Sequence, residues 1–272
     1  MSYRVIALDL DGTLLNPQKQ ILPQSLTAIN QARRQGVKVI IATGRHHVSI
    51  HPFYQALNLD TPAICCNGTY LYDYQAKKVL ESDPLSIEEA TKVIEYLKGT
   101  DINHLMYVDD AMLYQQYNDT IEQTLKWAES LPKNQRPNIY KVDNFNKAIQ
   151  QVTAIWKFAT YTPDIKKLRL FRKTIQEELN LACEWSWFDQ VDIAKKGNSK
   201  GLRLQRWVES QGLAMKDVIA FGDNFNDVSM LTAANLGVAM GNSCDEVKKH
   251  ADIITDQNSA PGIAEVIQKY VL

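Results

Sequence analysis

Two aspartates that follow a short apolar segment near the N-terminus constrain this chain more than any other feature. Residues 3–8 (Tyr-Arg-Val-Ile-Ala-Leu) are mostly apolar, which predicts a buried parallel strand. Asp9 and Asp11 come directly after it, and Gly12 allows the backbone to turn sharply. Because the ligands of open α/β sheets bind beyond the carboxyl ends of the strands, we expect both carboxylates at a ligand site.

Two carboxylates in one tight turn repel each other and therefore favour a bound cation. A hard cation with oxygen ligands, such as Mg²⁺, fits this pattern. With the ion in place, one carboxylate can attack an electrophile while the other transfers a proton. The alternative is a plain acidic turn, which would be preferred for an isolated Asp-x-Asp. The complete stretch Asp9-Leu10-Asp11-Gly12-Thr13 favours a functional site.

A second strand end carries groups that suit a phosphate. Residues 37–42 predict another buried strand, which ends at Thr43, Gly44 and Arg45, and residues 48–57 continue as a predicted helix. A threonine hydroxyl and free backbone N–H groups at the start of a helix can hold a phosphate group. Taken alone, Thr-Gly-Arg is equally compatible with a plain turn.

Lys200 stands in the first turn of a predicted amphipathic helix, after Ser199, which can cap the helix N-terminus. A cation is unfavourable at that end of the helix dipole. A bound phosphate would explain a residue that breaks the local rule. The alternative is an ordinary solvated lysine, which is our interpretation of Lys195 and Lys196.

Acidic residues meet the end of a strand a second time near the C-terminus. Residues 218–221 predict a buried strand, and Gly222, Asp223, Asn226 and Asp227 follow it. These carboxylates are therefore expected at the same edge of the sheet as the N-terminal pair.

Together and in this order, the four segments resemble the four signatures of the haloacid dehalogenase superfamily of phosphohydrolases. The resemblance covers essentially the whole chain. It implies an α/β fold with a Rossmann-like parallel-sheet core and an inserted α+β cap, as in Cof-type phosphatases. A change of composition at Pro84, with paired strand-like segments between helices, agrees with such an insertion. The predicted division is a catalytic core of residues 1–83 and 190–272 and a substrate-selecting cap of residues 84–189.

The resemblance also implies a mechanism and a metal ion. Asp9 would attack the phosphoryl group and form an aspartyl phosphate, and Asp11 would act first as the acid and then as the base. Mg²⁺ would be held by Asp9, Asp223 and the main-chain carbonyl of Asp11. Asp227 would orient the metal site or Lys200. The expected phosphate-binding groups lie at Leu10, Thr43, Gly44, Lys200 and Asn226.

Two longer segments, residues 45–55 and 64–73, resemble the pyridoxal phosphate phosphatase branch of the Cof type. This resemblance implies pyridoxal phosphate as the substrate. The candidate substrate contacts are Arg45, His47, Asn67 and Trp187. Asn67 is equally compatible with a hairpin turn, and Trp187 with the core of the cap.

Other functions remain open at this point. A sugar-phosphate phosphatase would differ only in the cap, and a phosphotransferase or mutase would use the same Asp9 intermediate. A non-enzymatic sensor on this fold would be expected to have lost an acid or Lys200, and this chain has kept them. His47 and His51 have a spacing that can bind Zn²⁺ from a helix, but the oxygen ligands favour Mg²⁺.

Composition narrows the expected partners to small molecules. The net charge of −1 provides no basic surface for nucleic acid. No apolar segment reaches the ~18 residues of a membrane helix, and no secretory leader precedes the first strand. The 4 cysteines lack a Cys-x-x-Cys spacing and predict reduced thiols. We therefore expect a cytoplasmic enzyme, a monomer or small homo-oligomer, that acts on a small phosphate ester.

Overall fold

The computed structural model describes residues 3–272, which form two compact units. The first unit contains the chain up to Gly44, Phe53–Glu81 and Ser199–Leu272. The second unit contains Arg45–Pro52 and Ser82–Asn198. None of the helices within residues 3–272 has the length and hydropathy that crossing a membrane requires.

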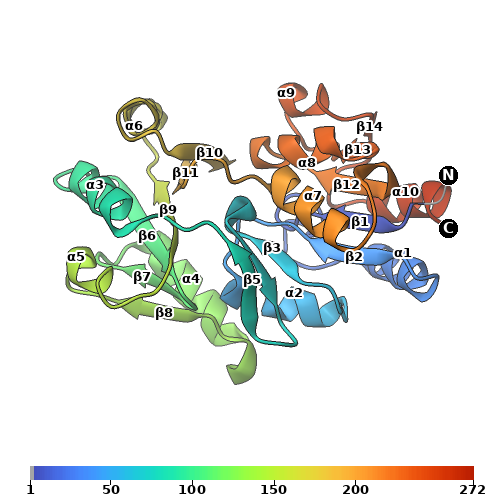
Figure 1. The fold of residues 1–272 in the computed structure, drawn as a ribbon, viewed down its shortest axis with the longest axis horizontal. Helices are drawn as coiled ribbons and strands as arrows, with labels where there is room; N and C mark the ends of the chain where they lie inside the picture. The colour runs from blue at the N-terminus through green and yellow to red at the C-terminus, as the bar shows by residue number, and fades with distance from the viewer. Residues whose placement is uncertain (1–2) are drawn as a thin grey trace. The chain divides into compact units, whose positions relative to one another are not determined.

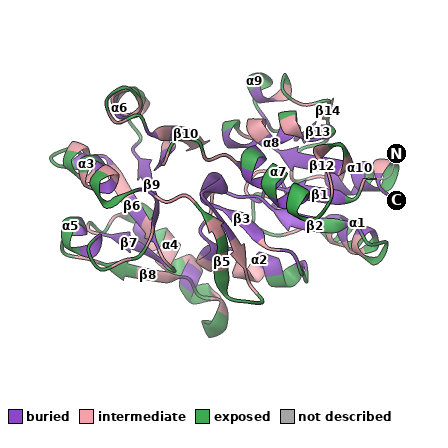
Figure 2. Ribbon diagram, viewed as in Figure 1, coloured by how far each residue is buried: buried purple, intermediate pink, exposed green. Residues whose placement is uncertain are grey.

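A five-stranded parallel sheet forms the middle of the first unit (Figure 1). In spatial order its strands are β14 (Ile253–Ile254), β13 (Leu236–Ala239), β12 (Val218–Gly222), β1 (Val5–Leu8) and β2 (Lys38–Ile41). Every neighbouring pair is parallel. Strand β1 is buried along its whole length (Figure 2), as expected of a parallel strand that is covered on both faces.

Helices cover both faces of this sheet. They are α1 (Pro23–Arg34), α7 (Lys200–Ser210), α8 (Val228–Ala233), α9 (Asp245–Lys248) and α10 (Gly262–Tyr270). Helices α7 and α8 pack on one face, where Leu204 and Trp207 share an apolar cluster with Ala7 of β1. Helices α1 and α10 contact each other on the opposite face (Figure 1).

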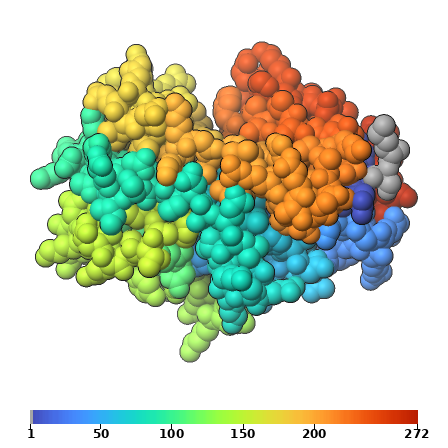
Figure 3. Space-filling model, in the orientation of Figure 1, coloured from blue at the N-terminus to red at the C-terminus, as the bar shows by residue number. Residues whose placement is uncertain are grey.

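A smaller sheet of β3 (Ala63–Cys65), β4 (Tyr70–Asp73) and β5 (Lys78–Ser82) extends the first unit. A bridge between Ala42 and Ile64 joins it to the end of β2. The turn before β4 is held by the buried Arg203, whose Nε donates a hydrogen bond to the carbonyl oxygen of Gly68 at 2.9 Å. The outer sides of β5 and α7 lie on the surface that Figure 3 shows.

The second unit is built on a separate six-stranded sheet. In spatial order its strands are β10 (Ala182–Trp187), β11 (Gln190–Ala194), β9 (Ile155–Tyr161), β6 (Asn103–Val108), β7 (Ala111–Tyr114) and β8 (Asn138–Lys141). Its helices are α3 (Ile87–Leu97), α4 (Asp119–Ser130), α5 (Phe145–Ala148) and α6 (Ile165–Leu179). Helices α3 and α6 pack on one face of the sheet, in an apolar cluster that includes Val93, Phe158 and Ile175.

The observed boundaries differ from the predicted ones in several places. Residues 45–52, 82–83 and 195–198, which the sequence assigned to the core, belong to the second unit. Residues 190–194, which the sequence assigned to the core, form strand β11 and pair with β9 and β10 of the second sheet. The helix expected over residues 48–57 is a 3₁₀ turn at His47–Ser49 followed by α2 (His51–Ala56). The sequence did not indicate strand β8. This strand lies at the edge of the sheet, and its residues are half-buried or exposed, so they form no apolar segment.

Candidate functional site

The predicted site residues of the first unit follow three neighbouring strands. Asp9 follows β1, Thr43 lies two residues beyond β2, and Asp223 follows β12. Because β1 is hydrogen-bonded to β2 and β12 in parallel, the carboxyl ends of the three strands meet at one edge. The backbone N–H of Asp9 still donates to the carbonyl oxygen of Phe221 at 3.1 Å, so the sheet continues up to the first carboxylate.

Lys200 lies at the centre of the site. It is the first residue of α7, whose N-terminus is capped by the Ser199 hydroxyl, which accepts a hydrogen bond from the Leu202 N–H. The Lys200 ammonium is fully buried and binds two carboxylates, Oδ1 of Asp9 at 2.7 Å and Oδ1 of Asp227 at 2.6 Å. Its place in the first turn of the helix is therefore explained by these buried anions.

Asp227 and Asp223 are tied to each other and to the first loop. The Oδ2 atom of Asp227 accepts hydrogen bonds from the backbone N–H groups of Asp223 at 2.9 Å and Asn224 at 3.0 Å. The Thr13 hydroxyl donates to Oδ1 of Asp223 at 2.8 Å. These bonds fix the orientation of both carboxylates. No role was predicted for Thr13, although it belongs to the same motif as Asp9.

Gly12 is the point where the first loop comes closest to Asp223. Its φ angle is +82°, in the left-handed region that favours glycine. A Cβ atom at this position would lie 2.2 Å from Oδ2 of Asp223. The turn after Asp9 therefore requires glycine both for its backbone conformation and for the space beside Asp223.

Burial and neighbouring charges shift the pKa values of Asp9, Asp223 and Lys200. Burial and the charge of Asp227 raise the pKa of Asp9 to about 7, in spite of the ion pair with Lys200. Burial and the charges of Asp9 and Asp227 raise the pKa of Asp223. Burial alone would lower the pKa of Lys200, but Asp227 and Asp9 outweigh it and hold that pKa above its ordinary value. The site thus has an excess of negative charge.

The donor set of the site suits a hard cation. One carboxylate oxygen from each of Asp9, Asp223 and Asp227 lies within 4.8 Å of the others. Oxygen donors of this kind fit Mg²⁺, and a divalent cation would offset the mutual repulsion among these carboxylates. Within residues 3–272 the histidines at 46, 47 and 51 are not part of this cluster, which leaves the zinc alternative without a ligand set.

The phosphate-binding candidates lie beside the acidic cluster. The side-chain amide of Asn226 donates to Oδ1 of Asn67 at 3.0 Å, and a Cβ at Gly44 would lie 2.9 Å from that same oxygen. The Oδ1 atom of Asn226 is buried, and within the part of the chain that is described no hydrogen-bond donor reaches it. Thr43 is buried. The backbone of Leu10 is held in the first loop, where its carbonyl oxygen accepts a hydrogen bond from the N–H of Leu15 at 2.8 Å.

Asp11 stands apart from the Lys200 network. Its Oδ1 atom binds the ammonium of Lys19 at 2.7 Å, and its carboxylate is only partly buried. The sequence did not single out Lys19, since a lysine in a polar loop carries no signal until its partner is known. The Asn67–Asn226 contact was equally absent from the sequence prediction.

The other predicted substrate contacts belong to the second unit. The guanidinium of Arg45 lies 5.6 Å from the centre of the Trp127 ring. His47 is buried against His46, with their ring centres 4.6 Å apart, and burial lowers its pKa to about 3. Trp187 is 46% exposed at the tip of the β10–β11 hairpin. Trp187 is therefore not fully buried in its unit, and its contact with a substrate stays a prediction.

Comparisons with known proteins agree with this arrangement. The model of the haloacid dehalogenase-like hydrolases matches residues 6–267. The sequence is 56% identical over 272 residues to the pyridoxal phosphate phosphatase YbhA of Escherichia coli (strain K12), covering 100% of both chains. It is 30% identical to the 5-amino-6-(5-phospho-D-ribitylamino)uracil phosphatase YitU of Bacillus subtilis (strain 168), covering 98% of this chain and 97% of that one. A haloacid dehalogenase-like hydrolase from Bacteroides thetaiotaomicron superimposes with a TM-score of 0.84 at 26% identity, covering 98% and 99% of the two chains.

Proposed function

Since this chain belongs to the haloacid dehalogenase-like hydrolase family, we propose that it is a Mg²⁺-dependent phosphatase that acts on pyridoxal phosphate through an aspartyl phosphate. The resemblance inferred from the four motifs is confirmed, as are the predicted fold class and the enzyme class, a phosphoric monoester hydrolase. The choice of substrate is supported by the full-length relative at 56% identity, which is a pyridoxal phosphate phosphatase.

Asp9 is the proposed nucleophile. Its carboxylate oxygen attacks the phosphorus atom, the bond from phosphorus to the ester oxygen breaks, and Asp11 gives its proton to the departing alcohol. In the second step Asp11 takes a proton from water, whose oxygen attacks the phosphorus and releases phosphate from Asp9. The observation that carries this proposal is the buried Lys200, which binds Oδ1 of Asp9 at 2.7 Å and holds the carboxylate in one orientation.

The phosphoryl oxygens are proposed to bind a ring of donors from the same edge. In phosphoryl transfer, positioning and charge stabilisation provide most of the catalysis. The Lys200 ammonium supplies positive charge, and the backbone N–H groups supply directed hydrogen bonds. The proposed donors are the backbone of Leu10 and Gly44 and the side chains of Thr43, Lys200 and Asn226.

The acidic cluster is the proposed metal site. Asp9 and Asp223 would ligate Mg²⁺ through carboxylate oxygens and Asp11 through its main-chain carbonyl. When bound, the ion offsets the repulsion between Asp9 and the phosphate and stabilises charge in the transition state. Asp227 acts through its partners, since it holds Lys200 and the backbone of Asp223 in place.

The second unit is proposed to be the substrate-selecting cap. The first unit's catalytic groups recognise only the phosphoryl group, so selection among leaving groups needs other residues. Arg45, His47 and Asn67 are proposed contacts for the leaving group. Trp187 presents a flat apolar surface suited to stacking on the pyridine ring, and its neighbour Phe188 has its ring centre 6.2 Å away.

The test of substrate choice is phosphate release with Mg²⁺ from pyridoxal phosphate, sugar phosphates and acetyl phosphate. We expect the highest kcat/KM for pyridoxal phosphate, and a sugar phosphate with the highest value would contradict the proposal. Release in water without an acceptor also excludes an obligate phosphotransferase or mutase. We further propose a cytoplasmic enzyme, monomeric or a small homo-oligomer, that binds neither nucleic acid nor membranes.

The ring-stacking role of Trp187 needs its own comparison. Stacking contributes about 0.5–1.5 kcal/mol beyond area burial, so Trp187→Ala should lower kcat/KM for pyridoxal phosphate by roughly tenfold. Acetyl phosphate has no ring and should lose much less. Phe188→Ala is tested beside it, since Phe188 is 73% exposed on the same hairpin. Equal losses on both substrates would show that Trp187 is structural.

A further inference from the structure

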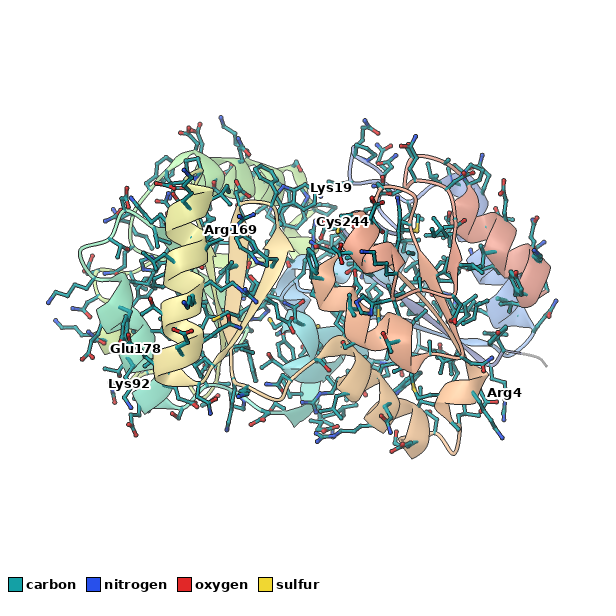
Figure 4. The ribbon with its side chains drawn as sticks, turned by 90° about the horizontal axis from the view of Figure 1, so that it is seen from above. Arg4, Lys19, Lys92, Arg169, Glu178 and Cys244 are labelled. Atoms are coloured by element: carbon teal, nitrogen blue, oxygen red, sulfur yellow. The ribbon has the colours of Figure 1, made fainter. Side chains whose placement is uncertain are left out.

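We propose that Lys19 is a positioning residue that holds the Asp11 carboxylate in the orientation from which it transfers protons. This inference rests on the proposed function, because it assumes that Asp11 is the acid and base. It assigns a role to the loop between β1 and α1, from which Lys19 projects at the surface of the first unit (Figure 4). Nothing in the four motifs includes this residue.

The loop that carries Lys19 is internally built. Leu15 and Ile21 form an antiparallel bridge across its base. The side-chain oxygen of Asn16 accepts hydrogen bonds from the backbone N–H groups of Gln18 at 3.0 Å and Gln20 at 2.9 Å. The N–H of Lys19 donates to the carbonyl oxygen of Asn16 at 2.8 Å. The hydrogen bonds within the loop therefore hold the backbone of Lys19 in place.

The backbone of Lys19 has a conformation that lysine disfavours. Its φ angle is +59°, in the left-handed region, where glycine and asparagine are accommodated more readily. Lys77 has the same conformation, so the backbone alone does not mark Lys19. What distinguishes Lys19 is that its ammonium binds the Asp11 carboxylate.

The ion pair acts on Asp11 and not on the phosphate site. The ammonium of Lys19 binds Oδ1 of Asp11 at 2.7 Å, and the two side chains are 47% and 28% exposed. With Oδ1 accepting from the Lys19 ammonium, Oδ2 is the oxygen that carries the proton to the leaving oxygen in the first step and takes one from water in the second. A fixed orientation of Asp11 favours both transfers. Lys19 belongs to none of the proposed phosphate or metal ligands. Its loss should therefore lower kcat and leave KM unchanged.

The expected size of the effect follows from the exposure of the pair. An exposed ion pair of this kind is worth at most about 1 kcal/mol, which corresponds to a roughly fivefold change in rate. We therefore expect Lys19→Met to lower kcat about fivefold. Lys19→Arg keeps the charge and should restore most of the activity. Lys19→Asn suits the left-handed backbone and removes the charge, so it should lose activity as Lys19→Met does.

Lys77 provides a matched control. It is an exposed lysine with a left-handed φ of +51°, in the turn between β4 and β5. That turn is closed by Asp73, whose Oδ1 accepts the N–H groups of Gln75 and Ala76, as Asn16 closes the loop of Lys19. Lys77→Met removes the same group from the same kind of backbone away from the catalytic edge. It should keep wild-type kcat and KM.

The leaving group separates a role through Asp11 from other roles. An alkyl phosphate needs a proton on its leaving oxygen, whereas an aryl phosphate with an acidic leaving group needs it much less. Lys19→Met should therefore lower kcat for an alkyl ester such as pyridoxal phosphate more than for 4-nitrophenyl phosphate. In an Asp11→Asn background, Lys19→Met should not lower the residual release from 4-nitrophenyl phosphate any further, because the residue through which it acts is gone.

The outcomes distinguish this inference from the proposed function. If the wild type and Lys19→Met have equal kcat while Asp11→Asn is inactive, the positioning role is wrong and the proposed function stands. A rise in KM with unchanged kcat would also overturn the inference, since it would make Lys19 a substrate contact. If Asp11→Asn has wild-type activity on an alkyl ester, the acid–base assignment fails, and the inference fails with it.

Discussion

The buried ion pair of the second unit should be worth several kcal/mol when only one partner is removed. The Lys157 ammonium on β9 lies 2.6 Å from Oδ2 of Asp192 on the neighbouring strand β11, and both side chains are at most 2% exposed. Gln190 donates to the other oxygen of Asp192 at 3.1 Å, and the ammonium lies 4.6 Å from the centre of the Tyr107 ring. Each charge thus depends on partners that water cannot replace.

Lys157→Met should therefore destabilise the protein by about 3–5 kcal/mol, because it leaves a buried carboxylate without its cation. Asp192→Leu should cost a similar amount for the converse reason. The double variant Lys157→Met/Asp192→Leu removes both charges together, and it should lie within about 1 kcal/mol of the wild type or be more stable. The sum of the single effects should greatly exceed the effect of the double change.

The assay is urea unfolding, followed by far-UV circular dichroism and by tryptophan fluorescence, with the midpoints compared at constant slope. Lys167→Met is the matched control, since the Lys167–Asp101 pair of the same unit is 2.5 Å long but 39% and 72% exposed. That change should cost much less than Lys157→Met, because the pair is exposed to solvent. If Lys157→Met costs no more than the Lys167 control, burial does not govern the energy of the pair and the reasoning is wrong.

Two predictions concern the catalytic edge. Chelation should abolish phosphate release, and added Mg²⁺ should restore it. Asp223→Ala should raise the Mg²⁺ concentration needed for half-maximal rate, because a fixed anionic ligand is lost. Full rescue by Zn²⁺ but not by Mg²⁺ would contradict the assignment of oxygen ligands. Gly12→Ala should lower both activity and the melting temperature, because its Cβ would lie 2.2 Å from Oδ2 of Asp223 at a φ of +82°. Gly197 has a φ of +99° and open space around it, so Gly197→Ala measures only the cost of placing a side chain on a left-handed backbone. Equal losses of activity in the two variants would contradict a role for the close approach of Gly12 to Asp223.

The sequence predicted the core of the fold because its strands are short apolar segments. Both faces of a parallel strand are buried, so residues 5–8 and 218–221 read as nearly continuous apolar stretches. The polar residues that end these strands had to meet at one edge of the sheet. The positions of Asp9 and Asp223 beside each other followed from those two facts together.

The sequence was less informative wherever the partner of a residue lies far along the chain. In the sequence, Lys157 and Asp192 each look like an ordinary surface charge on a strand. Their pairing becomes evident only when the antiparallel pairing of β9 and β11 is known. The Lys19–Asp11 pair depends on the exact path of a polar loop. Strand β11 was assigned to the wrong unit because a strand carries no mark of which sheet it joins.

The proposed mechanism is tested most directly by looking for phosphate on Asp9 during turnover. The enzyme is mixed with Mg²⁺ and pyridoxal phosphate, quenched in acid within the first turnovers, digested, and examined by mass spectrometry. An aspartyl-phosphate mechanism predicts a phosphorylated peptide that contains Asp9 and that disappears on longer incubation. The peptide should be absent in a folded Asp9→Asn variant, which should release phosphate several orders of magnitude more slowly. Phosphate on a different residue, or near-wild-type release by Asp9→Asn, would contradict this mechanism.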